Sequence, residues 1–210
     1  MRYSAEHKRE TRARVVTAAG QVFRKEGYGG AGIDALTKAA GVTNGAFYGN
    51  FKSKSEAFRT AVLAGLEDLR QGIAALKADQ PKGWLKTFVG YYLGYKRTCD
   101  LGESCALPSL SPDVMRADHE TRSAYTAELK RIIEEVAAGL PENAAPRQPE
   151  TARGDQAILL LALLSGGVTL ARAVSDPALS ERIANVVGQA ALSWTSQGKQ
   201  GARNPASRIR

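Results

Sequence analysis

Apolar residues recur along almost the whole chain at the spacing of an amphipathic helix, and the alternating pattern of a strand is nearly absent. Glycine and proline divide this pattern into segments, because both residues favour turns. The pattern predicts an all-α protein with helices over residues 5–26, 33–40, 43–51, 54–78, 84–98, 118–139 and 154–174, and a last helix from Pro177. Residues 99–112 are expected to be irregular or only briefly helical, and 141–153 to form a loop, since both ranges contain prolines.

The ends of the first helices carry residues suited to those positions. Gly27 and the glycines after it end the first helix, because glycine tolerates the left-handed conformation of a C-cap. Gly41 breaks the second helix. Thr43 begins the third, since its hydroxyl can accept a hydrogen bond from a free N–H of the first turn. Helices in this order, with a glycine turn between the second and the third, describe a helix-turn-helix.

The charge of the chain is concentrated at its ends. The sequence has 29 Lys and Arg against 21 Asp and Glu, a net charge of +8. Residues 1–60 hold 11 basic and 5 acidic residues, and the tail from Lys199 is also basic, so that the middle is slightly acidic. A basic end on a near-neutral body is typical of polyanion binding, because phosphate contacts release counterions. Charge alone fits a solvated surface with a chance excess of cations equally well.

The third helix is the candidate reading helix, with its N-terminal residues toward base edges. Asn44 has an amide able to pair with adenine, and the small Gly45 and Ala46 allow close approach to the major groove. Tyr48 and Asn50 have side chains that suit phosphate contacts. Lys54 does too, and it lies at the N-terminus of a long helix, where the helix dipole favours anions.

Two stretches resemble the N-terminal domain of TetR-type transcriptional repressors. They are Phe-Arg-Lys-Glu-Gly-Tyr at 23–28, and 33–54, which contains Ala-Ala-Gly-Val, Phe-Tyr, Phe and Ser-Lys in this order and spacing. The resemblance covers roughly residues 9–60. It implies an all-helical homodimer with a variable C-terminal ligand domain. It also implies DNA contacts from positions in and around the motif, namely Gly32, Thr43, Asn44, Gly45, Ala46, Tyr48, Asn50 and Lys54.

Four positions depart from the family pattern. Gly32 stands where the family usually has a Ser or Thr cap that also touches phosphate, a change that costs the second helix about a few tenths of a kcal/mol. Thr37 replaces a small alanine, and Gly49-Asn50 replaces a bulkier residue followed by histidine. The motif remains intact, and the alternative is a helical packing domain that does not bind DNA.

The last two helices are the candidate dimer interface. Residues 159–164 are apolar nearly all round, which requires burial on more than one side, and the glycines that follow suggest close backbone packing. TetR-type proteins dimerise through their last two helices, so the resemblance implies a partner contact from Leu160, Leu164, Gly167, Val187, Ala191 and Trp194. The alternative is a monomer core. A two-fold dimer predicts a near-palindromic operator.

A ligand pocket is expected around the tyrosine-rich helix 84–98, where the family has its pocket. Tyrosine offers an apolar wall and a polar handle together. The candidate lining residues are Phe88, Tyr91, Tyr92, Tyr95, Cys105 and Tyr125. For any single one of them, ordinary core packing is the competing interpretation.

Cys99 and Cys105 are the only cysteines, so a disulfide framework is excluded and a reducing cytoplasm fits. Some TetR-type regulators sense oxidants or electrophiles through a cysteine in a similar region. Basic residues beside these thiols would lower their pKa and Asp100 and Glu103 would raise it, so the sequence leaves reactivity open. A buried or incidental thiol is the alternative.

Other classes of protein find little support. His7 and His119 are the only histidines, no cluster has the spacing of metal ligands, and no glycine loop cradles phosphate, so we predict no enzyme, no metal and no cofactor. No uninterrupted apolar run reaches the roughly 18 residues of a membrane span, and no secretory signal begins the chain.

The favoured function is a sequence-specific DNA-binding regulator released by an unknown small-molecule effector or by modification of Cys105. The domains are then a DNA-binding domain at 1–53, a ligand-binding and dimerisation domain at 54–198, and a basic, disordered tail at 199–210. The ligand is expected to tilt the long helix 54–78. The alternatives are a non-specific architectural DNA-binding protein and a small helical enzyme that uses the tyrosine-lined pocket.

Overall fold

Helices and their connecting turns make up the fold, with no strand among the residues described, which confirms the all-α prediction. The structure is a computed structural model that describes residues 5–140 and 150–196. Contacts group the chain into a first unit of Met1–Gly72 and Thr98–Ile132 and a second of Ile73–Arg97 and Ile133–Arg210. The predicted functional boundary between residues 53 and 54 stays a prediction, and the predicted disordered tail lies outside the described residues.

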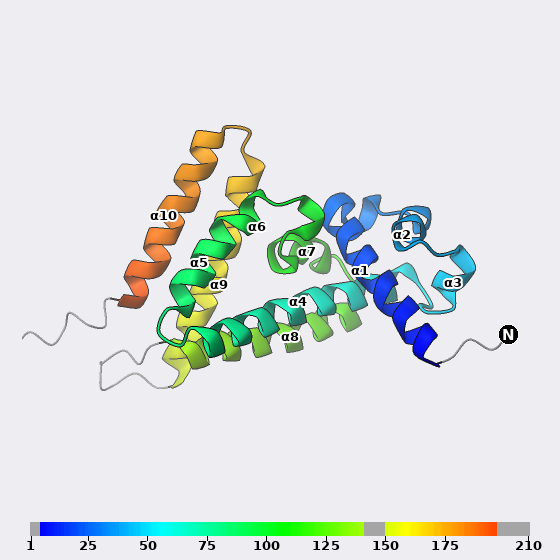
Figure 1. The fold of residues 1–210 in the computed structure, drawn as a ribbon, viewed down its shortest axis with the longest axis horizontal. Helices are drawn as coiled ribbons and strands as arrows, with labels where there is room; N and C mark the ends of the chain where they lie inside the picture. Colours follow the sequence, from blue (N-terminus) through cyan, green and yellow to red (C-terminus); the bar gives the residue numbers. More distant parts are fainter. Residues whose placement is uncertain (1–4, 141–149, 197–210) are drawn as a thin grey trace, which may run out of the picture. The chain divides into compact units, whose positions relative to one another are not determined.

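The first unit begins with α1 (Ala5–Gly30), α2 (Ile33–Ala40) and α3 (Asn44–Tyr48), blue to cyan in Figure 1. Gly27, with a positive φ of 70°, ends the first stretch of α1, as predicted. A short helical stretch that the sequence did not predict follows it to Gly30. Gly41 caps α2 with φ of 64°, as predicted. α3 ends three residues earlier than predicted, because its C-cap is Gly49.

An aromatic and aliphatic core holds these helices together. Phe23 of α1 is fully buried, and its ring lies edge-on to Phe58 with centroids 5.1 Å apart. Tyr28 packs on Phe58 at 5.0 Å. Leu36 of α2 and Phe47 of α3 are also fully buried, so each helix of the motif contributes an anchor to one core.

The rest of the first unit comes from α4 (Lys54–Asp79), η1 (Leu101–Glu103), α7 (Ala106–Val114) and α8 (His119–Gly139). α4 and α8 extend into the second unit beyond Gly72 and Ile132. Because of the prolines, the sequence predicted at most a brief helix here, whereas α7 extends over Ala106–Val114. Pro108 lies in the first turn, where its missing N–H has no intrahelical partner to lose, and the helix continues past Pro112.

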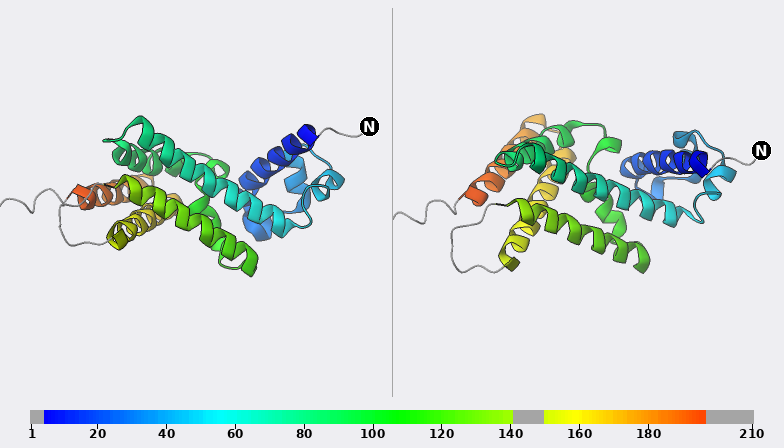
Figure 2. Two further views of the ribbon diagram at one scale, coloured as in Figure 1. Left: turned by 90° about the horizontal axis from the view of Figure 1, so that it is seen from below. Right: turned by 60° about the horizontal axis from the view of Figure 1, so that its bottom comes forward.

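The second unit is built around α9 (Glu150–Ala173) and α10 (Pro177–Ser196), which lie side by side and both contact α5 (Trp84–Leu93), as Figures 1 and 2 show. α9 begins four residues before its predicted start. Gly167 accounts for the close approach of α9 to α10, because a Cβ there would lie 2.7 Å from Val187 Cγ1.

The helix predicted over 84–98 is divided in two, with α6 (Tyr95–Thr98) following α5. Gly94 is the dividing residue, and a Cβ there would lie 2.6 Å from the carbonyl oxygen of Gly90. Arg172 Nη1 donates to the carbonyl oxygens of Lys96 and Arg97 at 2.8 and 2.9 Å, and thus holds α6 to the end of α9.

Within the described chain, Arg153–Ala173 of α9 has the length and apolar composition of a membrane span. The expectation from the sequence concerned uninterrupted apolar runs, and the apolar run within this helix stops at Ser165, Gly166 and Gly167. A buried helix of a folded domain passes the same test, and Leu160, Leu161 and Leu164 of α9 are buried within the second unit.

Candidate nucleic-acid interface

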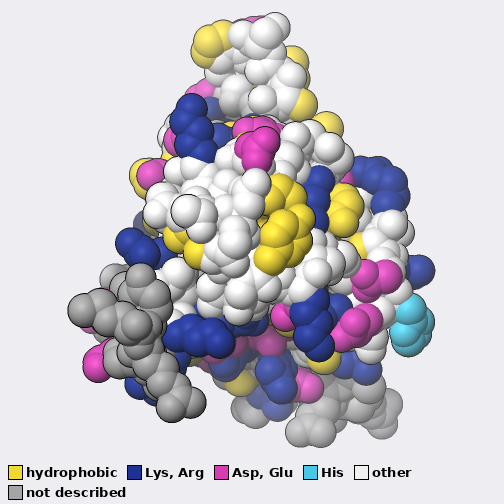
Figure 3. Space-filling view, turned by 90° about the vertical axis from the view of Figure 1, so that its right-hand side faces the viewer, with side chains coloured by type: hydrophobic (Ala, Val, Ile, Leu, Met, Phe, Trp, Pro, Cys, Tyr) yellow, Lys and Arg dark blue, Asp and Glu magenta, His cyan; other side chains and the backbone are white. Residues whose placement is uncertain are grey.

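The turn between α2 and α3 and the first turn of α3 form an exposed, uncharged surface. Thr43, Asn44, Gly45 and Tyr48 are all exposed. In the face drawn in Figure 3, the middle is occupied by uncharged atoms, drawn white, and by a cluster of hydrophobic side chains. Separate Lys and Arg side chains, interspersed with Asp and Glu, lie around it. Uncharged atoms in the middle and cations at the border are the pattern expected of a surface that approaches bases and contacts phosphates.

The predicted cap of the reading helix is present. Thr43 Oγ1 accepts a hydrogen bond from the backbone N–H of Ala46 at 3.2 Å, which leaves the hydroxyl proton available to an acceptor outside the protein. Gly32 caps α2 without any side-chain hydrogen bond, in line with its departure from the family pattern. Around Gly45, a Cβ would meet only Thr43 Oγ1 at 3.9 Å, so the space above this residue is open.

Several candidate contact residues are engaged within the first unit. Asn44 is hydrogen-bonded to Asp34 and Thr37 of α2. Asn50 Nδ2 donates to the carbonyl oxygen of Ala46 at 2.8 Å, and Lys54 Nζ lies 4.5 Å from the centroid of the Tyr28 ring. These internal contacts fix the side chains in place, and their contacts with DNA stay predictions.

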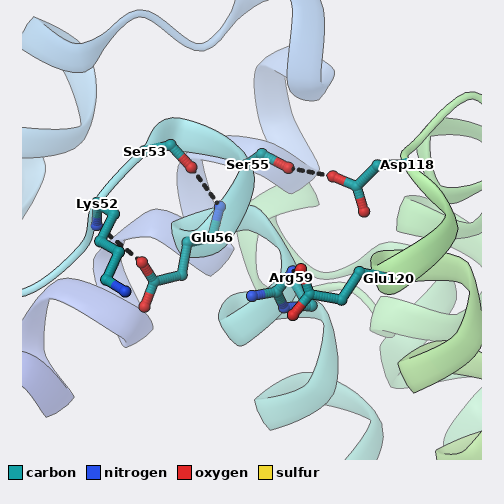
Figure 4. A pocket seen from close by; sticks show the side chains of 7 residues that line it. All are labelled: Lys52, Ser53, Ser55, Glu56, Arg59, Asp118 and Glu120. Carbon is teal, nitrogen blue, oxygen red and sulfur yellow. Dashed lines mark hydrogen bonds and ion pairs between the residues drawn. The ribbon is translucent and has the colours of Figure 1, made fainter.

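The N-terminus of α4 lies beside a polar pocket of about 390 Å³, shown in Figure 4. Ser53 Oγ accepts from the backbone N–H of Glu56 at 3.1 Å, and Glu56 Oε2 accepts from that of Lys52 at 2.8 Å. This reciprocal arrangement is a variant of the capping box. It fixes the first turn of α4, and with it the position of Lys54.

Side chains at the start of α8 bind side chains of α4 on the other side of this pocket (Figure 4). Ser55 Oγ donates to Asp118 Oδ2 at 2.6 Å, and Arg59 forms an ion pair with Glu120 at 2.7 Å. Asp118 also accepts from the backbone N–H of Thr121. The hydrogen bond from Ser55, followed by those from Thr121, lowers the pKa of Asp118 to about 2.

We expect Asp118→Asn to destabilise the protein at neutral pH by an amount that shrinks in acid. A carboxyl whose pKa is lower in the folded than in the unfolded state stabilises the fold above its unfolded pKa of about 3.9. That contribution is lost as the pH falls toward 2. Urea midpoints of both proteins at pH 6, 4 and 3 test this, and a difference that stays constant over that range contradicts it.

Arg24 of α1 lies at the centre of a second polar cluster. Its Nη1 donates to the carbonyl oxygen of Gly102 at 3.2 Å. A Cβ at Gly65 would lie 2.6 Å from Arg24 Nη2 and from Ala106 Cβ, so the guanidinium fills a narrow space. Burial lowers the pKa of Arg24, and Cys105 and Asp68 act in the opposite direction. The buried Cys105, the N-cap residue of α7, thus lies near a guanidinium of the first helix.

The residues predicted to line a ligand pocket divide between the two units. Phe88 and Tyr92 are buried in the second unit, whereas Tyr91 and Tyr95 are half exposed and stack with centroids 5.6 Å apart. Cys105 and Tyr125 belong to the first unit. Tyr125 Oη shares a 2.7 Å hydrogen bond with Ser111 Oγ, and burial raises the pKa of Tyr125. A ligand pocket formed by these residues stays a prediction.

The residues predicted to contact a second subunit lie on α9 and α10, and their contact with a partner stays a prediction. Leu160, Leu164 and Ala191 fill the core of one chain, Gly167 is buried against Val187, and the side chain of Trp194 lies outside what the structure describes. Apolar side chains of α9 and α10 that remain exposed are Ile158, Leu159, Leu170, Leu179 and Val186. These side chains are apolar surface that the core of one chain leaves uncovered.

Nothing in the sequence pointed to Arg24, Asp118 or Asp34, because each makes its hydrogen bond with a residue of another segment of the chain. The sequence did draw attention to Thr37, the second partner of Asn44, because a threonine stands there in place of the alanine usual in the family. In the described part of the chain, no group of three or more His, Cys, Asp or Glu is arranged to hold a metal ion.

Comparison with known proteins identifies the motif. The family described as bacterial regulatory proteins, tetR family, matches residues 15–60. The chain is 31% identical over 125 residues to the HTH-type transcriptional repressor DhaR of a Mycobacterium species, a match over 59% of this chain and 60% of that protein. It is 43% identical over 63 residues to the uncharacterized HTH-type transcriptional regulator TtgW of Pseudomonas putida, over 30% and 46% of the two chains.

The crystal structure of the reduced form of E. coli NemR shares the fold, with a TM-score of 0.69 and 22% identity over 85% of this chain and 96% of that one. The chain spans less than two thirds of the length of the two curated relatives. Residues 15–60, which include α2 and α3, therefore match the helix-turn-helix domain of the tetR family of bacterial regulatory proteins.

Proposed function

We propose that this protein is a transcriptional regulator that binds a specific operator through α3 and acts as a repressor. The observation that carries the proposal is the capped, exposed α2–turn–α3 surface, which coincides with the residues matched by the family. The first turn of α3 offers one amide and two residues without long side chains, a combination that lets the backbone approach base edges.

Phosphate contacts come from the exposed cations of the first unit. Lys8, Arg9, Lys38 and Lys52 are exposed, whereas Lys25 and Arg59 are paired with Asp100 and Glu120. The affinity for DNA therefore falls steeply with salt, since each neutralised phosphate lowers the logarithmic slope by about 0.9.

The regulator works as a homodimer through α9 and α10. Ile158, Leu159, Leu170 and Val186 are each about half exposed, and exposed apolar side chains on two helices packed together favour contact with a partner. A two-fold pair presents two reading helices about one turn of DNA apart, so the operator is a near-palindrome.

A small molecule releases the operator. α4 carries Lys54 at its first residue and continues to Asp79, past the boundary of the first unit, so a ligand that shifts α4 also shifts the reading head. The ligand achieves this only through a higher affinity for the released state than for the bound state. The aromatic residues of α5 and α6 are the proposed apolar wall.

Modification of Cys105 is a second route to release. The thiol lies near Arg24 and Tyr125, so a bulky group on its sulfur would disturb the contact of α1 with η1. N-ethylmaleimide adds the sulfur across its double bond, and the thiol proton ends on the adjacent carbon. We expect this reagent to weaken operator binding of the wild type and of Cys99→Ser, and to leave Cys105→Ser unaffected; an equal response of all three rules out this route.

Selection of DNA from a random library by the full-length protein tests the proposal. We expect enrichment of one near-palindromic sequence. Equal binding of selected and random DNA would favour a non-specific architectural protein instead. Failure to bind any DNA, together with turnover of a small molecule, would favour an enzyme.

A further inference from the structure

The side chain of Asn44 is hydrogen-bonded to two residues of the preceding helix, α2. Its Nδ2 lies 3.3 Å from Asp34 Oδ1, and its Oδ1 lies 3.1 Å from Thr37 Oγ1. Asp34 and Thr37 are one turn apart on α2, so they face the same side of that helix. Thr37 is 5% exposed, whereas Asn44 and Asp34 are exposed. The amide thus lies on the surface, and its hydrogen bonds with Asp34 and Thr37 determine its orientation.

The chemistry of the two partners sets which way the amide points. An ionised carboxylate only accepts hydrogen bonds, so the NH₂ group, and not the oxygen, must face Asp34. The amide oxygen then faces Thr37, whose hydroxyl donates to it. The same hydroxyl also lies 3.2 Å from the carbonyl oxygen of Asp34, so its single proton is shared between two acceptors. A flip of the amide would place its oxygen against the carboxylate of Asp34, and only the contact with Thr37 could be kept, with the hydroxyl as acceptor.

An amide held in this way still has one N–H and one oxygen lone pair for another molecule. Asn44 is followed by Gly45 and Ala46, which present no polar side-chain atoms. Hydrogen-bond recognition of bases by side chains in the first turn of α3 thus depends mainly on this one group. Because adenine and other bases differ in the order of donors and acceptors along the major-groove edge, the direction of the amide determines which base it favours.

We propose that Thr37 and Asp34 are positioning residues for base recognition, and that they set the base preference at one operator position by fixing the amide of Asn44. The inference rests on the proposed DNA-binding function. Thr37, which departs from the family's usual alanine, then contributes to specificity without touching DNA.

The test uses full-length protein and the operator selected by the wild type, with every base substituted in turn at each position of one half-site. The variants are Thr37→Val, which keeps the shape and removes the hydroxyl, and Thr37→Ser, which restores it. Asp34→Asn is the second route to the same effect, and because Asp34 is exposed this change leaves the core intact. Asn44→Ala and the double variant with Thr37→Val complete a cycle, and thermal unfolding is followed for each.

We expect Thr37→Val and Asp34→Asn to reduce discrimination at the same single position by about 5- to 10-fold, within the range of one good base contact, and to leave the other positions unchanged. Thr37→Ser should retain the wild-type preference. In the Asn44→Ala background, Thr37→Val should have no further effect on discrimination. A uniform loss of affinity at all positions, or an undiminished effect of Thr37→Val without Asn44, overturns the inference. If the wild type itself selects no operator, the proposed function fails, and the inference fails with it.

Discussion

Gly45→Glu should abolish specific operator binding without changing the stability of the protein. Gly45 lies in the first turn of α3, and its Cβ would meet only Thr43 Oγ1 at an ordinary contact distance of 3.9 Å, so the fold accepts a side chain there. In the complex the new carboxylate would lie between the backbone of α3 and the DNA. Like charges brought together at an interface cost several kcal/mol, which corresponds to a loss of affinity of about 100-fold or more.

Gly72→Glu is the matched control, because it makes the same change of charge at an exposed position of α4 where a Cβ meets nothing within 4 Å. Titration of labelled operator at one salt concentration measures both variants, and thermal unfolding confirms that they are folded. Near-wild-type affinity of Gly45→Glu, or an equal loss in Gly72→Glu, would show that α3 is not the reading helix.

Phe23→Ala should remove a large part of the stability of the first unit. The Phe23 ring is fully buried and lies edge-on to Phe58 at 5.1 Å and near Tyr28 at 6.2 Å. Truncating a buried phenylalanine costs about 3–5 kcal/mol, through lost burial and the cavity that remains. The free energy of unfolding of a typical domain is only about 5–15 kcal/mol.

Urea unfolding followed by circular dichroism measures this effect. Met115→Ala is the control, since Met115 is 69% exposed and its truncation should change the free energy of unfolding by less than about 0.5 kcal/mol. A similarly small effect of Phe23→Ala would contradict the packing of α1 against α4.

The helix-turn-helix could be predicted well because its signals are local. Gly41 at the end of α2 and Thr43 at the start of α3 act on backbone groups within a few residues, and both have the predicted role. The start of α10 at Pro177 likewise follows from the fixed φ of proline. In each case the residue type that ends or begins the helix can be recognised in the sequence, so the boundary could be predicted from it.

Features that depend on distant contacts escaped the sequence. α7 contains two prolines that propensity counts against a helix, but its Leu107, Leu110 and Val114 are buried and tertiary packing stabilises it. In the sequence, Gly94 looks like any glycine that a helix tolerates. Only the structure shows that the carbonyl oxygen of Gly90 lies so close that a Cβ at Gly94 would clash with it. Neither effect has a signature within a short window of sequence.

The candidate site shows the same division. Residue type alone identified the exposed Thr43, Asn44 and Gly45. It gave no sign that Lys54 packs on Tyr28 or that Asp118 binds Ser55, since both contacts join segments that meet only in the folded unit. The sequence of α9 likewise does not tell its buried leucines, such as Leu160 and Leu164, from the exposed Leu159 and Leu170, because all of them are equally hydrophobic.

The central claim is sequence-specific DNA recognition by α3, and the most direct test is the ratio of two dissociation constants. The wild-type protein is titrated with the selected operator and with a scrambled duplex of the same length and composition, at the same near-physiological salt concentration. A specific regulator is expected to bind the operator about 1,000-fold or more tightly than the scrambled duplex. Equal dissociation constants for the two duplexes would contradict the account.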